Sequence, residues 1–242
     1  LNAAGQLVAL TDREHGPSAL FALFGEAQDY LDTHFPTPSK RERTSIDTAR
    51  LTRALMHACT AQGPFEADSH IRGRGGSLLP DGRLVYHAGD TIYVDGRSRE
   101  PGVVEGSVYP LRAPAPLPST ENHAAAAGEL LEALKSWNWR RGEGKQHIDA
   151  LLLLGWIALA PLGGALRWRP HIWVTGDSST GKSTLQSIIS AVLGKTGHVH
   201  ATSPTAAGLY TKLFCDATPV TLDEIEAKPE DTKTRDVINL IR

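Results

Sequence analysis

The chain has 242 residues, of which 40% are hydrophobic and 21% are charged, an ordinary balance for a soluble globular protein of one large domain or two small ones. Lysine and arginine total 25 against 27 aspartates and glutamates, so the formal net charge is −2. This balance excludes a chain that is basic overall. A nucleic acid would therefore have to bind at a local patch or in a pore formed by several chains.

The two cysteines, Cys59 and Cys215, lie far apart in the sequence. They form neither a metal-type spacing nor a disulfide framework, which fits a reducing compartment, so we expect a cytoplasmic protein. The sequence has no initiator Met and no charged-then-apolar leader, and both ends resemble cuts. We therefore expect a piece of a longer protein.

One strongly apolar segment, residues 151–166, reads LLLLGWIALAPLGGAL. It is shorter than the roughly 20 residues that a membrane-spanning helix needs. It also contains Pro161 and the pair Gly163-Gly164, and charged residues lie close on both sides. We expect a buried helix followed by a turn, and no membrane partner.

The first part of the chain, residues 1–111, is predicted to be a small α+β accessory domain. Residues 6–10 (QLVAL) are a strand candidate, and apolar residues at helical spacing predict helices over residues 18–34 and 46–62. Over residues 70–111, short β runs alternate with turn signals, which predicts a β-meander.

A Pro-rich, extended linker is expected over residues 112–121, and residues 122–242 form the second part. In chain order we expect helices at 122–136 and 145–160, a strand at 169–176, a helix at 182–194, a strand at 198–202, a helix at 205–214 and a strand at 219–224. This alternation predicts an α/β fold with a parallel sheet between layers of helices.

The stretch TGDSSTGKSTL, residues 175–185, fits the phosphate-binding pattern G-x-x-x-x-G-K-[ST] and predicts a P-loop NTPase core. Its backbone N–H groups and the dipole of the next helix would hold the β-phosphate of ATP. Lys182 would reach the β- and γ-phosphates, and the Ser183 hydroxyl would bind Mg²⁺. The nucleotide-binding residues that we assign are Gly176, Asp177, Ser178, Ser179, Thr180, Gly181, Lys182, Ser183 and Thr184.

A second motif, PVTLDE at residues 219–224, is an apolar strand candidate that ends in adjacent acids. Asp223 is placed to hold Mg²⁺ through a bound water, and Glu224 is placed to act as general base on the attacking water. The catalytic candidates are therefore Lys182 and Glu224, and the metal-ligand candidates are Ser183 and Asp223.

The glutamate beside Asp223 also narrows the class of enzyme. Small-molecule kinases and GTPases do not typically carry a water-activating glutamate on this strand, so Glu224 indicates an ATPase that must turn over to do work. The compact interval from Lys182 to Asp223 resembles that of superfamily III helicases and their AAA+ relatives.

A closer resemblance rests on two stretches, GWIALAPLGGALRWRPHIWVTGDSSTGKSTL (155–185) and ATSPTAAGLYTKLFCDATPVTLDEIE (201–226). Together they look like the ATPase part of phage- and plasmid-type primase–helicases, and the likeness covers about residues 125–242. The β-rich stretch HIRGRGGSLLPDGRLVYHAGDTIYVDG (70–96) resembles, more weakly, the segment that precedes the ATPase in such proteins.

This resemblance implies an ATP- and Mg²⁺-dependent DNA helicase or translocase of phage-type replication. Such a protein forms a homo-oligomeric ring, such as a hexamer, on single-stranded DNA. The family also carries a sensor residue and an arginine finger, and we assign neither in this chain. Two alternatives stay open: an ATP-driven switch, assembly or defence ATPase without DNA unwinding, and a phosphotransferase in which Asp223 serves a small-molecule hydroxyl.

Aromatic and basic residues alternate in SWNWRRGEGK, residues 136–145. Such a pattern can stack bases and hold phosphates, but we favour an interpretation in which Trp137 and Trp139 pack into the core and the charges are solvated. By the same reasoning Arg72 and Arg74 are expected to be solvated residues of a strand. A metal site at His198 and His200 is not favoured.

Overall fold

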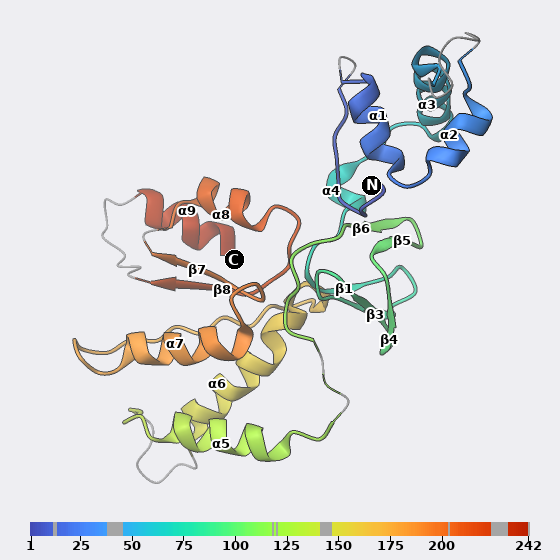
Figure 1. Cartoon of the computed structure of the whole chain (residues 1–242). Coiled ribbons are helices and arrows are strands. Elements are labelled where there is room, and N and C mark those ends of the chain that lie inside the picture. The colour runs from blue at the N-terminus through green and yellow to red at the C-terminus, as the bar shows by residue number, and fades with distance from the viewer. Residues whose placement is uncertain are drawn as a thin grey trace. The chain divides into compact units, whose positions relative to one another are not determined.

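The computed structural model describes residues 1–11, 14–37, 46–117, 119, 121–140, 147–202, 204–223 and 232–241. Within this part of the chain the fold mixes helices with small antiparallel sheets and one parallel pair of strands (Figure 1). The chain divides into two compact units. Unit 1 contains Leu1–Ile71 and Pro101–Arg112, and unit 2 contains Arg72–Glu100 and Ala113–Arg242. The domain boundaries at residues 111 and 122 stay a prediction.

Unit 1 is built from short helices and one hairpin. Its elements are α1 (Pro17–Phe24), α2 (Gln28–His34), α3 (Thr48–Gln62), α4 (Ala67–His70), β5 (Gly102–Val104) and β6 (Ser107–Tyr109). Helix α3 begins after Asp47, whose carboxylate accepts a hydrogen bond from the backbone N–H of Arg50 at 2.9 Å and so caps the helix. The buried core of this unit consists of Leu20, Leu31, Ile46 and Leu51.

Two predictions for unit 1 are wrong. The single helix expected over residues 18–34 is broken at Gly25, which adopts φ 53°, a left-handed conformation that glycine tolerates and that a continuing helix excludes. Residues 6–10, expected as a strand, have no regular secondary structure. Their apolar residues Leu7 and Val8 are exposed, so neither a sheet partner nor a core holds this segment extended.

The predicted β-meander is present, and most of it belongs to unit 2. Strands β1 (Gly75–Leu78), β2 (Leu84–His87), β3 (Ile92–Val94) and β4 (Arg97–Arg99) form an antiparallel sheet in sequence order. Gly82, Gly89 and Gly96 all have positive φ in the turns that connect these strands. Val85 and Ile92 are fully buried and form the inner face of this sheet.

Strand β1 packs closely on η1 (Ala160–Ala165), the 3-10 turn that follows the apolar helix α6 (Ile148–Leu159). A Cβ on Gly76 would lie 2.8 Å from the Cα of Leu162, which is closer than packed carbon atoms approach. A Cβ on Gly164 would in turn collide with the carbonyl oxygen of Gly76. The glycines predicted to end the apolar helix therefore allow two backbones to touch.

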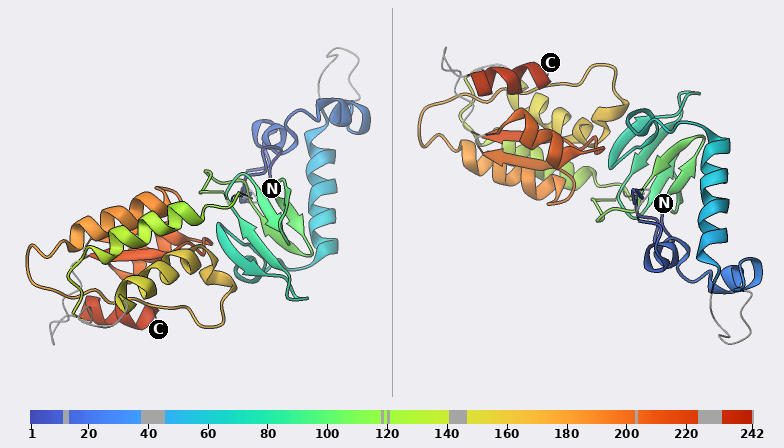
Figure 2. Two further views of the ribbon diagram at one scale, coloured as in Figure 1. Left: turned by 90° about the horizontal axis from the view of Figure 1, so that it is seen from below. Right: turned by 90° about the horizontal axis from the view of Figure 1, so that it is seen from above.

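Helices α5 (Ala124–Lys135), α6 and α7 (Lys182–Leu193) form the main helical core, in agreement with the helices predicted there. Figure 2 shows these helices lying side by side. Their buried residues are Leu134, Ala150, Leu153, Ile157, Ala160, Leu185, Ile189 and Leu193.

Strands β7 (Val199–Thr202) and β8 (Val220–Asp223) form the parallel pair, joined through helix α8 (Ala206–Leu213). Helix α8 and helix α9 (Thr232–Ile241) cover one side of the pair, where Ala201, Leu209 and Val237 are buried together. Helix α7 lies on the other side (Figures 1 and 2). The predicted order strand, helix, strand over residues 198–223 is therefore correct.

The strand predicted at residues 169–176 is wrong. These residues have no regular secondary structure, and residues 171–180 are all exposed, including Trp173 at 60%. A parallel strand needs a hydrogen-bonded neighbour, and within the described residues the parallel sheet has only its two strands. The described residues therefore do not form the expected larger parallel sheet in front of the phosphate loop.

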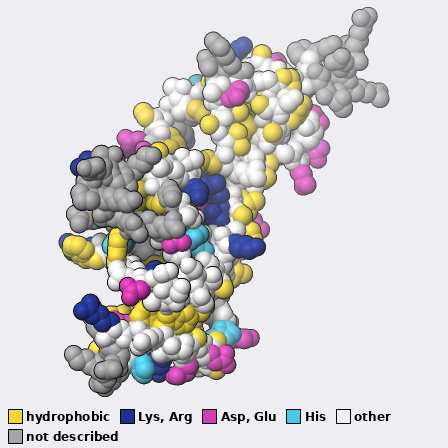
Figure 3. Space-filling view, turned by 90° about the vertical axis from the view of Figure 1, so that its left-hand side faces the viewer, with side chains coloured by type: hydrophobic (Ala, Val, Ile, Leu, Met, Phe, Trp, Pro, Cys, Tyr) yellow, Lys and Arg dark blue, Asp and Glu magenta, His cyan; other side chains and the backbone are white. Residues whose placement is uncertain are grey.

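Within the described residues, one helical segment, Ile148–Ala165, is long and apolar enough to cross a membrane by length and composition alone. Its inner side packs in the helical core and on β1, while Leu151 and Leu152 are 46% and 58% exposed. The prediction of a buried helix is thus correct for one side of α6 only. Figure 3 shows hydrophobic side chains reaching the surface in groups on one face of the molecule.

Candidate phosphate-binding site

The candidate loop, residues 176–184, leads into the N-terminus of α7, whose first residue is Lys182. Gly181 directly precedes the helix with φ 85° and ψ 16°, and Ser179 also has a positive φ of 63°. An L-residue with a side chain rarely adopts such angles, so Ser179 marks a locally constrained backbone. These two residues with positive φ bend the chain directly before the first turn of α7.

Lys182 folds back over the loop that precedes it. Its Nζ donates hydrogen bonds to the carbonyl oxygens of Gly176 and Asp177, both at 2.7 Å. The Thr180 hydroxyl donates to the same Asp177 carbonyl at 2.8 Å. An ammonium group has three N–H donors, so one donor of Lys182 is left for an anion enclosed by the loop.

The backbone N–H groups of the loop have no protein acceptor within the described part of the chain. Among the residues that the structure describes, none of the amides from Asp177 to Thr184 donates a hydrogen bond, and the first amide of the region to do so is that of Leu185. Consecutive unpaired N–H groups at a helix N-terminus, where the helix dipole is positive, form a ready site for phosphate. Residues 177–184 therefore place several neutral donors and one cation in one short segment of the chain.

The first glycine of the pattern lies close to the Thr180 side chain inside the loop. A Cβ on Gly176 would lie 2.9 Å from the Thr180 hydroxyl oxygen. That hydroxyl is held in place by its bond to Asp177. A side chain at position 176 would therefore displace the Thr180 hydroxyl from its bond to Asp177.

Ser183 lies in the first turn of α7 and is exposed, and Asp223 ends β8, half-buried and in register with Thr202. One contact ties these two elements together: the Gln186 side-chain amide lies 3.5 Å from the carbonyl oxygen of Leu222. Gln186 is one turn beyond Ser183, and Leu222 directly precedes Asp223. The loop helix and the acidic strand end are thus neighbours.

A magnesium ion would find few protein ligands here. Across the described ranges, no three His, Cys, Asp or Glu side chains gather as a metal site. Mg²⁺ commonly keeps several waters and binds through one or two protein groups together with substrate phosphates. Ser183 and Asp223 fit that ligand set, while Glu224, the candidate base, lies outside the described residues.

The sequence did not indicate that Trp137 belongs to this site. Its indole packs against the helical core, as expected, but its N–H also donates to the carbonyl oxygen of Gly181 at 3.3 Å. Trp139 packs on the same core and donates instead to Leu134 at 2.7 Å. The two tryptophans look equivalent in sequence, so nothing in the pattern could have separated them.

The remaining predictions from the sequence concern two arginines and two histidines. Arg74 is not the solvated residue that was expected, because its side chain is 18% exposed and pairs with Asp216, while Arg72 is exposed. His198 bonds to Ser190 and to Gly194, and His200 bonds to Thr221. The two histidines thus have separate partners.

No protein-family model matches the sequence, and no curated protein and no solved structure matches it. The assignment of the loop therefore rests on its sequence pattern and on its own geometry.

Proposed function

We propose that the chain binds MgATP on residues 176–184 and hydrolyses it as a P-loop ATPase. The observation that carries the proposal is the set of unpaired amides from Asp177 to Thr184, closed on one side by the Lys182 ammonium group. A triphosphate satisfies such donors with its non-bridging oxygens, and the lysine adds a charge-assisted hydrogen bond.

The roles follow from the chemistry of each group. Lys182 would contact the phosphates, and Ser183 and Asp223 would hold Mg²⁺, which would offset the negative charge of the phosphates. Glu224 would take a proton from the attacking water as the water oxygen bonds to the γ-phosphorus and the bond from that phosphorus to the β–γ bridging oxygen breaks, so that ADP leaves.

We assign residues 122–242 to a P-loop NTPase core with a parallel sheet. Two features support this assignment. The phosphate loop leads directly into α7, and the segment from β7 through α8 to β8 is a parallel crossover that ends at Asp223. Ligands of open α/β sheets bind beyond the carboxyl ends of the strands, which is where Asp223 lies.

We further propose that hydrolysis drives movement along single-stranded DNA by a homo-oligomeric ring of this protein. The support is the sequence resemblance to phage-type primase–helicases over residues 125–242. A net charge of −2 means that the DNA must meet a local basic surface or a shared pore. The rival is an ATP-driven switch that does not move on DNA.

Two measurements test these proposals in order. Calorimetry with MgATP should detect binding by the wild-type chain, and an absence of binding would remove the nucleotide site and everything built on it. ATP hydrolysis should then rise when single-stranded DNA is added. A chain that binds and hydrolyses ATP without any response to DNA would support the switch and end the translocase proposal.

A further inference from the structure

Trp137 lies just beyond α5, after Ser136, in the turn that leads toward α6. Its backbone is held by a hydrogen bond from its N–H to the carbonyl oxygen of Leu134 and by one from Trp139 to its own carbonyl oxygen at 2.9 Å. The indole ring packs on the core shared by α5, α6 and α7. The side chain therefore has a rigid base from which to reach the phosphate loop.

The atom that Trp137 contacts is the one that orients the start of α7. The Gly181 carbonyl oxygen accepts from the Trp137 indole at 3.3 Å and from the Leu185 backbone N–H at 2.9 Å. In a planar trans peptide the carbonyl oxygen and the next N–H point in opposite directions. Two donors on the Gly181 oxygen thus hold the Lys182 N–H pointing out of the helix, toward the space that a phosphate would fill.

The ring also occupies the space beside Gly181. A Cβ on Gly181 would lie 2.8 Å from the indole nitrogen, and Gly181 has φ 85°. A glycine at this position therefore serves two needs at once: it takes the left-handed conformation, and it admits the indole against the backbone. Both contacts involve the same peptide unit.

We propose that Trp137 is a positioning residue of the phosphate site. It orients the Gly181–Lys182 peptide so that the Lys182 amide points at the bound β-phosphate, and it links nucleotide binding to the α5–α6 helices. This inference rests on the proposed nucleotide site. The sequence indicated two roles for Trp137, packing in the core or stacking on bases. The role proposed here is a different one.

The chain contains a matched control for this proposal. Trp137→Phe keeps a large apolar ring but removes the indole N–H donor to Gly181. Trp139→Phe makes the same chemical change on the same core, and the donor that it loses bonds to Leu134, away from the loop. A purely structural effect should appear equally in both variants.

The affinities of MgATP and of magnesium tripolyphosphate should be measured by calorimetry for the wild type and both variants. Tripolyphosphate isolates the phosphate contacts because it has no base or sugar. We expect Trp137→Phe to weaken both ligands about three- to tenfold, the usual effect of one hydrogen bond, and Trp139→Phe to leave both unchanged. Equal affinities in Trp137→Phe and the wild type, or equal losses in the two variants, would overturn the proposal.

A second measurement uses the wild-type protein and does not depend on how a variant folds. The indole N–H resonance of Trp137 should shift when tripolyphosphate binds, while that of Trp139 should stay in place. A Trp137 resonance that does not move at saturation would refute the positioning role. If the wild type binds neither MgATP nor tripolyphosphate, the nucleotide site itself is refuted, which is a distinguishable result.

Discussion

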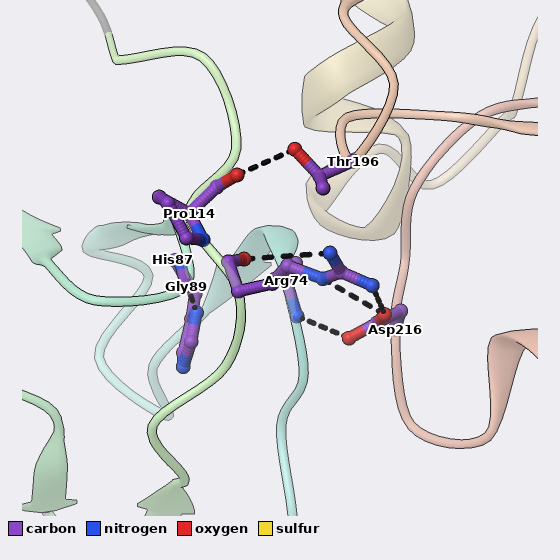
Figure 4. A network of polar contacts seen from close by, with 7 residues as sticks. Arg74, His87, Gly89, Pro114, Thr196 and Asp216 are labelled. Carbon is purple, nitrogen blue, oxygen red and sulfur yellow. Dashed lines mark hydrogen bonds and ion pairs between the residues drawn. The ribbon is translucent and has the colours of Figure 1, made fainter.

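Arg74, which directly precedes β1, and Asp216, in the loop before β8, are 142 positions apart and form an ion pair in which two guanidinium nitrogens donate to one carboxylate oxygen. The Asp216 carboxylate accepts from the Arg74 guanidinium at 2.6 and 3.0 Å and from the Arg74 backbone N–H at 2.8 Å. Figure 4 shows the two side chains facing each other. The flanking backbones are also paired, since Gly73 donates to Cys215 and Ala217 donates to Arg74. The meander is thus tied to the strand that carries Asp223.

Replacing Asp216 with alanine should destabilise the protein by about 3 kcal/mol. The Asp216 side chain is 5% exposed, so its loss leaves a guanidinium and a backbone N–H with unmet hydrogen bonds in a partly dry site. Asp216→Asn should cost less, because the amide oxygen still accepts one bond. Urea denaturation gives both free energies of unfolding.

The exposed pair of Arg83 and Asp81 is the control for that experiment. Its nitrogen–oxygen distance is also 2.6 Å, but both side chains reach solvent. Such pairs add little to stability, so Asp81→Ala should leave the free energy of unfolding almost unchanged. Equal losses at the two sites would mean that burial does not determine how much the Arg74–Asp216 pair contributes to the free energy of unfolding.

Two adjacent glycines of η1 should respond in opposite ways to alanine. A Cβ on Gly164 would collide with the Gly76 carbonyl and lie 2.6 Å from the Ala217 Cβ, whereas a Cβ on Gly163 would meet nothing within 4 Å. We expect Gly164→Ala to lose about 1–3 kcal/mol of stability through overpacking, and Gly163→Ala to be neutral or slightly stabilising. Thermal unfolding of both variants, followed by circular dichroism, decides whether β1 rests on η1.

Lys182→Ala should weaken MgATP binding on the order of 100-fold. The change removes a charged hydrogen bond to phosphate and also the two bonds that close the loop over Gly176 and Asp177. Calorimetry measures the loss, and an unchanged unfolding transition shows that the fold is intact. An ATP affinity equal to that of the wild type would place the nucleotide elsewhere.

Glu224→Gln should bind ATP normally but hydrolyse it roughly 10²–10⁴-fold more slowly, because the glutamine cannot take a proton from water. This prediction rests on the sequence, since Glu224 lies outside the described residues. Single-turnover hydrolysis in the presence of Mg²⁺ measures the chemical step. Turnover near that of the wild type would assign the base to another residue.

The effect of Mg²⁺ on ATP affinity should depend on Ser183. Chelating the ion should weaken ATP binding by the wild type, because the ion bridges the phosphates and the protein. In Ser183→Ala the difference between the ATP affinities with Mg²⁺ and with the ion chelated should be smaller than in the wild type. The ATP affinity without metal should be similar in the two proteins. A metal effect of full size in Ser183→Ala would remove this residue from the ligand set.

The local elements of this protein follow closely from its sequence. Gly82, Gly89 and Gly96 adopt a positive φ, which glycine tolerates, and form the turns of the meander. Helix α7 begins at Lys182, directly after Gly181. The bonds that Lys182 and Thr180 make inside the phosphate loop are as local, because they join residues that are at most six positions apart. Such features depend on backbone sterics and on neighbouring donors, which a short pattern contains.

The predictions from the sequence are wrong where contacts between residues distant in the chain decide the structure. Residues 169–176 look like an apolar strand, yet they are exposed and have no regular secondary structure, because a strand forms only beside a hydrogen-bonded partner. Arg74 looks like a solvated residue of a strand until Asp216 is placed against it. No local pattern could have indicated either outcome.

Local sequence was enough to predict most helices, among them α3, α5, α6, α7 and α8, as well as the turns of the meander and the phosphate-binding pattern, because these features depend on contacts within a few residues. The packed fold was needed to see that Trp137, and not Trp139, donates to the Gly181 carbonyl, and that Arg74 is paired. These contacts span 44 and 142 positions of the chain, so they exist only after the helices and strands have packed.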